Sequence, residues 1–208
     1  MGEKYYSIVR EGKKMNVIFW DTETNGLKEY HSVLSISAIK YSFIIDGQNI
    51  ESNKKEQYER FYFRKPDEKI GEEAIAVNGL TDEVISKRRN GVDYPEHFHN
   101  DIIPFRRFCT DTKHFVGHNI YYDKQYINFW LPNIFCTMIA NTKIIGLKKA
   151  NGKSKYPSLE ETAKFYGIET DKKELHGSMY DSYITYLIFL KMFENDRVKD
   201  KVMSFLGK

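Results

Sequence analysis

Two acidic side chains follow a short apolar segment near the start of the chain. Asp21 and Glu23 come directly after residues 16–20, a run of β-branched and aromatic residues typical of a buried strand. In an extended chain, residues two apart point to the same side, so both carboxylates can bind one metal ion. Mg²⁺ and Mn²⁺ prefer oxygen ligands. The pair therefore indicates a metal site that needs further carboxylates from elsewhere in the chain.

Two more acids and a histidine are candidates to complete this site. Asp123 comes shortly after a predicted strand at 114–116, and Asp181 opens the last long predicted helix, five residues after His176. Phosphodiester hydrolysis suits two divalent ions about 4 Å apart, one activating the attacking water and the other stabilising the leaving oxygen. A nearby histidine can take the proton of that water near neutral pH. Together the five residues indicate metal-dependent hydrolysis of a phosphodiester.

Three segments around these residues resemble the motifs of a known enzyme family. WDTETNGL (20–27), FVGHNIYYD (115–123) and HGSMYD (176–181) resemble the three motifs of the DEDDh (DnaQ-like) 3′-to-5′ exonucleases. Further stretches are similar to the proofreading epsilon subunit of bacterial DNA polymerase III, namely residues 78–83, 158–168 and 175–185. The resemblance covers about residues 15 to 193, which is nearly the whole chain.

The resemblance implies a fold and a role for each candidate residue. The implied fold is α/β and ribonuclease-H-like, with a mixed five-stranded sheet flanked by helices. Two divalent ions, Mg²⁺ or Mn²⁺, would be held by four carboxylates, those of Asp21, Glu23, Asp123 and Asp181. His176 would be the general base. Substrate contacts are implied for six more residues, Thr24, Asn25, Gly26, Leu27, His118 and Asn119, with Leu27 packing on the terminal base.

Several other residues have two interpretations. His118 is as consistent with a structural hydrogen bond as with a substrate contact, and Asn78 stands where many epsilon-like proteins have histidine. Aromatic side chains at 121, 122, 126, 129 and 130 either stack on bases or fill the core. The basic loop 147–157 either contacts phosphates or is only solvated. The remaining histidines are expected at the surface or in packing, and His97 and His99, two apart on a predicted helix, should not face one ligand.

The elements that position these residues follow from periodicity and turn signals. Besides the strands at 16–20 and 114–116, a strand with a bulge near Ile39 is expected at 33–45, with a turn at Asp46-Gly47 and an antiparallel partner at 58–63. A helix is expected at 72–77, and a second one begins after Thr81, which caps it. A third is expected at 96–109, where Pro104 should distort it. Four more helices are expected at 124–131, 134–145, 159–166 and 182–193. Ser158 and Glu161 form a capping box, and 198–205 has the spacing of an amphipathic helix that docks on its own domain.

Length and composition set the outer limits. With 208 residues, the chain is long enough for one α/β domain, which we expect at 15–195, with an N-terminal extension at 1–14 and an amphipathic tail at 196–208. The net charge of +3 gives no overall basic field, so nucleic acid must be bound by local patches. No signal peptide or membrane segment is evident, and Cys109 and Cys136 lack zinc-site spacing. A cytoplasmic protein is expected.

Three functions remain open at this point. The first is a 3′-to-5′ exonuclease that releases nucleoside 5′-monophosphates from a single-stranded 3′ end of DNA, and epsilon-like stretches favour it. The alternative within the same chemistry is an exoribonuclease, which would gain from a contact to the 2′-hydroxyl. A non-catalytic nucleic-acid-binding module is disfavoured because all five residues are present. A polymerase or another replication protein is an expected partner.

Overall fold

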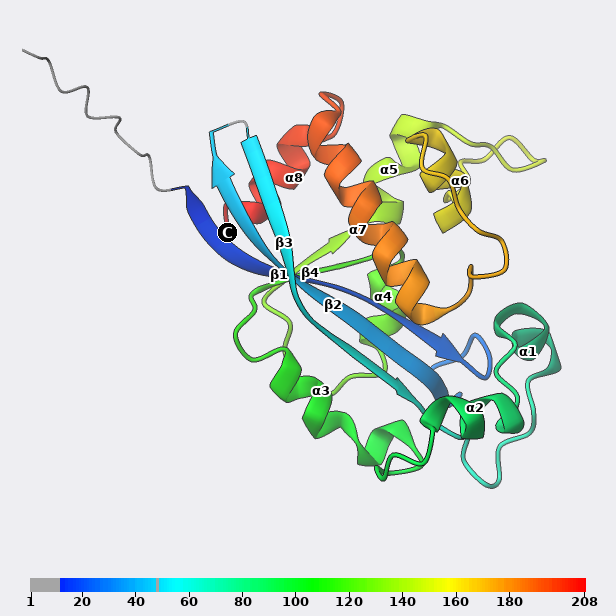
Figure 1. Cartoon of the computed structure of the whole chain (residues 1–208). Helices are drawn as coiled ribbons and strands as arrows, with labels where there is room; N and C mark the ends of the chain where they lie inside the picture. Colours follow the sequence, from blue (N-terminus) through cyan, green and yellow to red (C-terminus); the bar gives the residue numbers. More distant parts are fainter. Residues whose placement is uncertain (1–11, 48) are drawn as a thin grey trace, which may run out of the picture.

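A mixed five-stranded sheet forms the centre of the computed structural model, which describes residues 12–47 and 49–208 (Figure 1). Strands β1 (Lys13–Thr24), β2 (Val33–Asp46) and β3 (Asn49–Phe61) are antiparallel neighbours. Strands β4 (His114–Gly117) and β5 (Asn133–Cys136) continue the sheet parallel to β1, in the order β3-β2-β1-β4-β5. This architecture confirms the predicted ribonuclease-H-like fold.

Strand β1 is buried on both faces, and its alternation decides where its acidic end points. Val17 and Phe19 belong to the core on the side of helix α7 (Ser178–Glu194), whereas Ile18 and Trp20 belong to the core on the opposite side, with helix α3 (Ile102–Phe108). Side chains alternate along a strand, so Asp21 and Glu23 continue the row that faces α7.

Helices cover both faces of the sheet. On the side of α7 lie α5 (Thr137–Ile145), α6 (Leu159–Phe165) and α8 (Lys199–Leu206). On the other side lie α3, a short 3₁₀ turn η1 (Phe98–Asn100) and α4 (Ile120–Lys124), while α1 (Glu72–Asn78) and α2 (Asp82–Arg89) lie near the end of β1 (Figure 1). As predicted, Thr81 caps α2 and Ser158 forms the capping box of α6.

The C-terminal helix α8 docks on its own domain, as its spacing predicted. Val202, Phe205 and Leu206 are buried, and the ring of Phe205 packs against those of Phe135 and Phe189 at 5.2 and 6.0 Å. The tail predicted at 196–208 is therefore part of the core on the α7 side. Of the N-terminal extension predicted at 1–14, residues 1–11 lie outside the described part, and Lys13 already begins β1.

Strand β3 is longer than predicted. It starts at Asn49 and not at Tyr58. The charged residues within 51–56 can belong to the strand because β3 is at the edge of the sheet, where most of their side chains are exposed to solvent. It also ends at Phe61, before the expected Phe63. The bulge expected near Ile39 is confirmed, since the pairing of β2 with β3 shifts between Lys40 and Tyr41.

The helix predicted at 96–109 was wrong in its first half. His97 is extended (φ −117°, ψ 136°), η1 follows, and only Ile102–Phe108 is α-helical. Pro104 lies in the first turn of α3, where an amide has no partner within the helix, so proline is tolerated there. The rings of His97 and His99 stack at 5.8 Å and 7°. The helix from which their separation was argued is therefore absent at His97, and whether they face one ligand stays a prediction.

Three other helix boundaries were misplaced. The helix expected at 124–131 is α4, which starts at Ile120 and ends at Lys124. Residues 134–136 are in strand β5, because a short apolar run next to β4 is satisfied by pairing, and periodicity alone cannot separate the two states. Helix α7 begins at Ser178, four residues before the predicted start.

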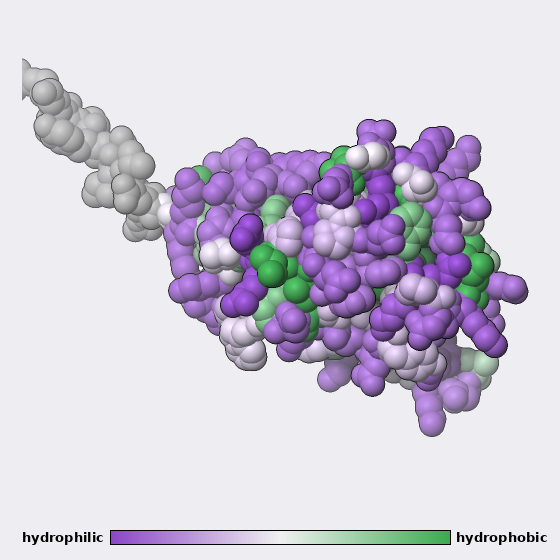
Figure 2. Space-filling model, turned by 90° about the horizontal axis from the view of Figure 1, so that it is seen from below, coloured by the Kyte–Doolittle hydropathy of each residue, from purple (hydrophilic) through white to green (hydrophobic). Residues whose placement is uncertain are grey.

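The surface is largely hydrophilic on the face shown in Figure 2, where hydrophobic residues gather only in small patches. Within the described ranges, none of the helices is both long enough and apolar enough to span a bilayer.

Candidate active site

The end of β1 brings acids toward two neighbouring elements. Asp21 and Glu23 face α7, and Thr22 between them continues the opposite row. Thr22 donates two hydrogen bonds to Oδ1 of Asp123, from its amide at 3.0 Å and from its hydroxyl at 2.6 Å. These bonds fix the Asp123 carboxylate, which comes from α4, against β1.

A tight turn after β4 gives α4 its position. A side chain at Gly117 would place its Cβ 2.9 Å from Cβ of Ile120, so only glycine fits without displacing the helix. Asn119, just before α4, has a left-handed backbone (φ 72°), which asparagine adopts more readily than most residues. Together these two residues turn the chain from β4 into α4 and direct Asp123 back to β1.

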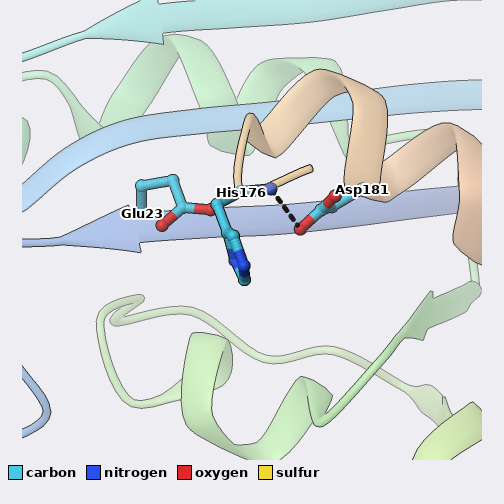
Figure 3. Close-up of side chains that lie close together, drawn as sticks. All are labelled: Glu23, His176 and Asp181. Carbon is cyan, nitrogen blue, oxygen red and sulfur yellow. Dashed lines mark hydrogen bonds between the residues drawn. The ribbon is translucent and has the colours of Figure 1, made fainter. Parts of the chain in front are cut away.

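His176 and Asp181 come from the loop and first turn at the start of α7. His176 has a left-handed backbone (φ 66°), and its amide donates to Oδ2 of Asp181 at 3.3 Å. Figure 3 shows this bond, with the carboxylates of Glu23 and Asp181 on either side of His176. One ligand atom from each of these three residues lies within 4.8 Å of the others. The His176 side chain is exposed, so its ring can meet solvent or a substrate.

The four carboxylates strongly perturb one another. Burial raises the pKa of Asp21 well above its ordinary value, and repulsion from Asp123, Glu23 and Asp181 raises it further. Burial, followed by repulsion from Asp181 and Asp123, raises the pKa of Glu23 to about 9. Burial raises the pKa of Asp123 and of Asp181 to about 7. At neutral pH the cluster therefore needs protons or a cation to compensate its charge.

The cluster has the chemistry of a divalent-metal site. Among the described residues, no basic side chain forms an ion pair with any of the four carboxylates. Oδ1 of Asp181 is buried and has no hydrogen-bond partner, which leaves a ligand atom free. Uncompensated carboxylate oxygens are the ligands that Mg²⁺ and Mn²⁺ prefer. The residues present therefore fit such ions.

The turn after β1 is held by its own side chains. The hydroxyl of Thr24 contacts the Gly26 carbonyl at 2.8 Å and the Tyr122 hydroxyl at 2.6 Å. Asn25 is buried, donates to the Lys69 carbonyl at 2.8 Å and accepts from the Gly71 amide at 2.9 Å. Leu27, in contrast, is 83% exposed. Thr24 and Asn25 thus build the turn, and Leu27 is a side chain that it presents to solvent.

His118 is held within the protein by both ring nitrogens. Nδ1 contacts the Thr137 hydroxyl and Nε2 contacts the Pro157 carbonyl, each at 3.0 Å. Burial lowers the pKa of His118 to about 4, so its ring is neutral at physiological pH. Both ring nitrogens of His118 are thus used in hydrogen bonds within the protein, which favours a structural role for this residue.

The structure also separates the aromatic residues by role. Hydroxyls of Tyr122 and Tyr126 bind carbonyls of the turn, those of Gly26 and Lys28, at 2.9 and 3.1 Å. Tyr121 and Trp130 are 54% and 76% exposed, and Phe129 packs against the core on the α3 side.

The basic loop 147–157 has contacts of its own. Lys148 pairs with Ser154 in an isolated bridge, and Lys155 forms an ion pair with Glu161.

Sequence reasoning missed one residue of the site, Thr22, and did not foresee the structural role of another, Asn78. The Thr22 hydroxyl donates to Asp123 and so orients its carboxylate. The sequence could have indicated this, because a residue between two acids that share one side of a strand must face the opposite side. Asn78, expected to affect only fine substrate contacts, donates to the Thr24 carbonyl at 3.2 Å, and its hydrogen bond to Glu23 favours the charged carboxylate. It thus ties the end of α1 to the acidic end of β1.

Comparison with known proteins places this geometry among exonucleases. The RNase T family model, described as an exonuclease, matches residues 18–189. DNA polymerase III subunit epsilon of Salmonella typhimurium is 24% identical over 190 residues, covering 84% of this chain and 70% of the relative. The same subunit of Escherichia coli K12 is 24% identical over 183 residues, with the same coverage.

Solved exonucleases share the fold. Exonuclease X in complex with 5′ overhanging duplex DNA has a TM-score of 0.57 at 20% identity, covering 90% of this chain and 99% of its own. The nuclease domain of 3′hExo, a DEDDh family member bound to rAMP, has a TM-score of 0.58 at 10% identity, covering 89% of this chain and 94% of its own.

Proposed function

The chain belongs to the DEDDh (DnaQ-like) exonuclease family, and we propose that it removes nucleoside 5′-monophosphates from the 3′ end of DNA with two divalent metal ions. One observation carries this proposal: four partly or fully buried carboxylates meet beside an exposed histidine, without a compensating basic side chain among the described residues.

Four residues would hold the ions, namely Asp21, Glu23, Asp123 and Asp181. When bound, Mg²⁺ or Mn²⁺ supplies Lewis-acid polarisation of the scissile phosphate and offsets the charge that develops on it. Thr22 keeps the Asp123 carboxylate in place through its two hydrogen bonds, and the His176 amide does the same for Asp181.

His176 is proposed as the general base. Its backbone is fixed by the bond to Asp181, while its ring is exposed and lies near the Glu23 carboxylate. A neutral imidazole can take the proton of the attacking water, which then displaces the 3′ oxygen of the remaining strand.

The turn from Thr24 to Leu27 is proposed to hold the terminal nucleotide. Its backbone is rigid because Thr24, Asn25 and Tyr122 anchor it, and the exposed Leu27 can pack on a base. Substrate contacts by His118 and Asn119 stay predictions.

DNA is the proposed substrate because the similar sequences are subunits of a DNA polymerase. This likeness also supports a polymerase as partner, and a cytoplasmic location stays a prediction. RNA is the second candidate, favoured by the likeness to the nuclease domain of 3′hExo bound to rAMP.

A gel assay with matched 5′-labelled DNA and RNA strands tests the proposal. The strands are incubated with Mg²⁺, Mn²⁺ or EDTA, using the wild type, Asp21→Ala and the control Asp46→Asn, which changes an exposed acid at the end of β2. We expect a metal-dependent ladder that shortens from the 3′ end, faster on DNA, and abolished only in Asp21→Ala. Faster cleavage of RNA would favour the second candidate, and binding without cleavage would contradict both.

A further inference from the structure

A cavity lies beside the turn that follows β1. Its volume is about 200 Å³, and its lining includes His31, Lys65, His97, His99, Gln125 and Tyr126. The Tyr126 hydroxyl lies 3.1 Å from the Lys28 carbonyl and 3.2 Å from the Tyr122 hydroxyl, and the Tyr122 hydroxyl donates to the Gly26 carbonyl. The cavity therefore shares a wall with the turn that is proposed to hold the terminal nucleotide.

The histidines of this cavity have ring nitrogens to spare. Nδ1 of His31 accepts from the Lys28 amide at 3.3 Å, so Nε2 carries the proton in the neutral ring. Nδ1 of His97 contacts the Phe63 carbonyl at 3.1 Å, to which it can only donate. Neither Nε2 forms a hydrogen bond with any residue in the described ranges. Both nitrogens are thus open to a ligand, Nε2 of His31 as a donor in the neutral ring and Nε2 of His97 as a donor when its ring is protonated.

The cavity is lined by one ammonium, that of Lys65, one carboxylate, that of Glu29, and three imidazoles. Burial and the proximity of His97 and Lys65 lower the pKa of His99, because a charge on its ring would be repelled. Of the neighbouring acids, Glu68 uses its carboxylate to bind Ser32, and Glu29 forms no ion pair within the described ranges. An anion bound beside Lys65 would favour the charged form of the two stacked rings, because it would offset the repulsion that opposes a charge there.

The type of ligand follows from the shape and the donors. A metal ion is disfavoured, because the described histidines here do not form a set with ligand atoms within 4.8 Å of one another. A phosphate offers several acceptor oxygens to imidazole and ammonium donors that approach from different elements. Tyr126, which lines the cavity, follows Asp123 by three residues and its amide donates to the Asp123 carbonyl, so the cavity and a proposed metal ligand are connected through one turn of the chain.

We propose that the cavity lined by His31, Lys65, His97 and His99 binds a backbone phosphate of the substrate strand, upstream of the nucleotide being removed. This inference rests on the proposed function, because the strand must enter with its 3′ end at the carboxylates. The cavity would hold the strand in register while the terminal linkage is cleaved.

Two substrates separate this site from the catalytic one. One is a 5′-labelled DNA strand of about 12 nucleotides, and the other is the p-nitrophenyl ester of thymidine 5′-monophosphate, which has no upstream strand. The variants are His97→Gln/His99→Gln and, separately, Lys65→Gln, all at partly or fully exposed positions. Lys55→Gln, an exposed lysine on β3, is the matched control.

We expect both variants to raise KM for the strand roughly 10-fold, because each removes charge-assisted hydrogen bonds to the phosphate. Hydrolysis of the small ester should not change. The slope of log(kcat/KM) against log[salt] should become less steep by about 0.7 for each phosphate that the variant no longer binds. In the wild type, a neutral methylphosphonate placed at one upstream linkage should raise KM, and the same substitution should have no effect in the variants.

Unchanged KM, salt slope and methylphosphonate profile in both variants, with an active wild type, would overturn the inference. Inhibition by thymidine 5′-monophosphate that the variants relieve, without any change in strand KM, would also overturn it, because the cavity would then hold a free nucleotide. A wild type that cleaves neither substrate would contradict the proposed function itself.

Discussion

At the scale of single residues, the site keeps four carboxylates close together although their negative charges are unfavourable there. Burial raises the pKa of Asp21, Glu23, Asp123 and Asp181, and repulsion from neighbouring carboxylates adds to this for Asp21 and Glu23. Thr22 and the His176 amide supply hydrogen bonds that partly offset this. Function and stability therefore oppose each other in this cluster, and removing a carboxylate should separate them.

Asp181→Asn should abolish cleavage and stabilise the metal-free protein. The substitution removes a ligand, and it also removes a buried charge that repels its neighbours. In EDTA at pH 8, we expect the free energy of unfolding to rise by on the order of 1–3 kcal/mol. Urea denaturation beside an activity assay measures both effects, with Asp46→Asn as the control. A variant that is inactive and also less stable would argue against repulsion in the cluster.

His176→Gly should lower kcat by roughly 10² to 10⁴-fold and leave the fold intact, because the ring is exposed and glycine adopts the left-handed backbone (φ 66°) freely. Added imidazole should restore part of the rate in this variant and none in Asp181→Asn. Single-turnover cleavage with and without imidazole measures this. A decrease of less than about 10-fold would exclude His176 as the base.

At the scale of elements, short turns decide where the acids lie. The turn between β4 and α4 works because Gly117 allows α4 to approach β4 and Asn119 takes a left-handed backbone before it. Similarly, the loop before α7 uses a left-handed His176 to place its own ring and Asp181 together. These turns are short, so a change in one backbone angle moves a metal ligand.

Replacing Asn119 tests this dependence. Asn119→Val should lower the melting temperature and weaken Mn²⁺ binding, because a β-branched residue is strained at φ 72°. Asn119→Gly should keep both, since glycine adopts this conformation freely. Thermal denaturation and calorimetric Mn²⁺ titration of the two variants provide the comparison. Equal behaviour of valine and glycine would show that the turn does not control the site.

Elements were predictable where a signal was local and strong. The caps of α2 and α6, the bulge of β2 and the amphipathic α8 each have a short-range signature, and all were confirmed. Strand β5 was misplaced because its state depends on pairing with β4, which periodicity does not contain, and α4 because its start is set by the turn at Gly117 and Asn119. The stacking of His97 on His99 could not be foreseen because the pattern predicted a helix where His97 is extended.

At the scale of the whole molecule, the sheet gathers residues from distant parts of the chain. Asp21, Asp123 and Asp181 meet because β1 is central, β4 is its parallel neighbour and α7 crosses β1. The five candidate residues were found from sequence because three motifs carry them in order. Supporting contacts such as those of Asn78 needed the folded chain.

The cluster should make stability depend on pH throughout the molecule. The carboxyl pKa values are raised to about 7 for Asp123 and Asp181 and to about 9 for Glu23. The folded protein therefore holds protons that the unfolded chain has already released, and stability falls as pH rises through this range. In EDTA, the melting temperature should fall from about pH 5 to pH 9, and Mg²⁺ should remove most of that fall. A flat profile in EDTA would contradict the raised pKa values.

The most direct test of the central claim is the cleavage rate of a DNA strand whose 3′-terminal linkage carries sulfur in place of one non-bridging oxygen. Mg²⁺ binds oxygen far better than sulfur, whereas Mn²⁺ tolerates sulfur. We predict that one of the two diastereomers is cleaved much more slowly in Mg²⁺ and that Mn²⁺ restores its rate. Equal slowing in both metals, or cleavage that persists in EDTA, would contradict metal-dependent removal of nucleotides from the 3′ end.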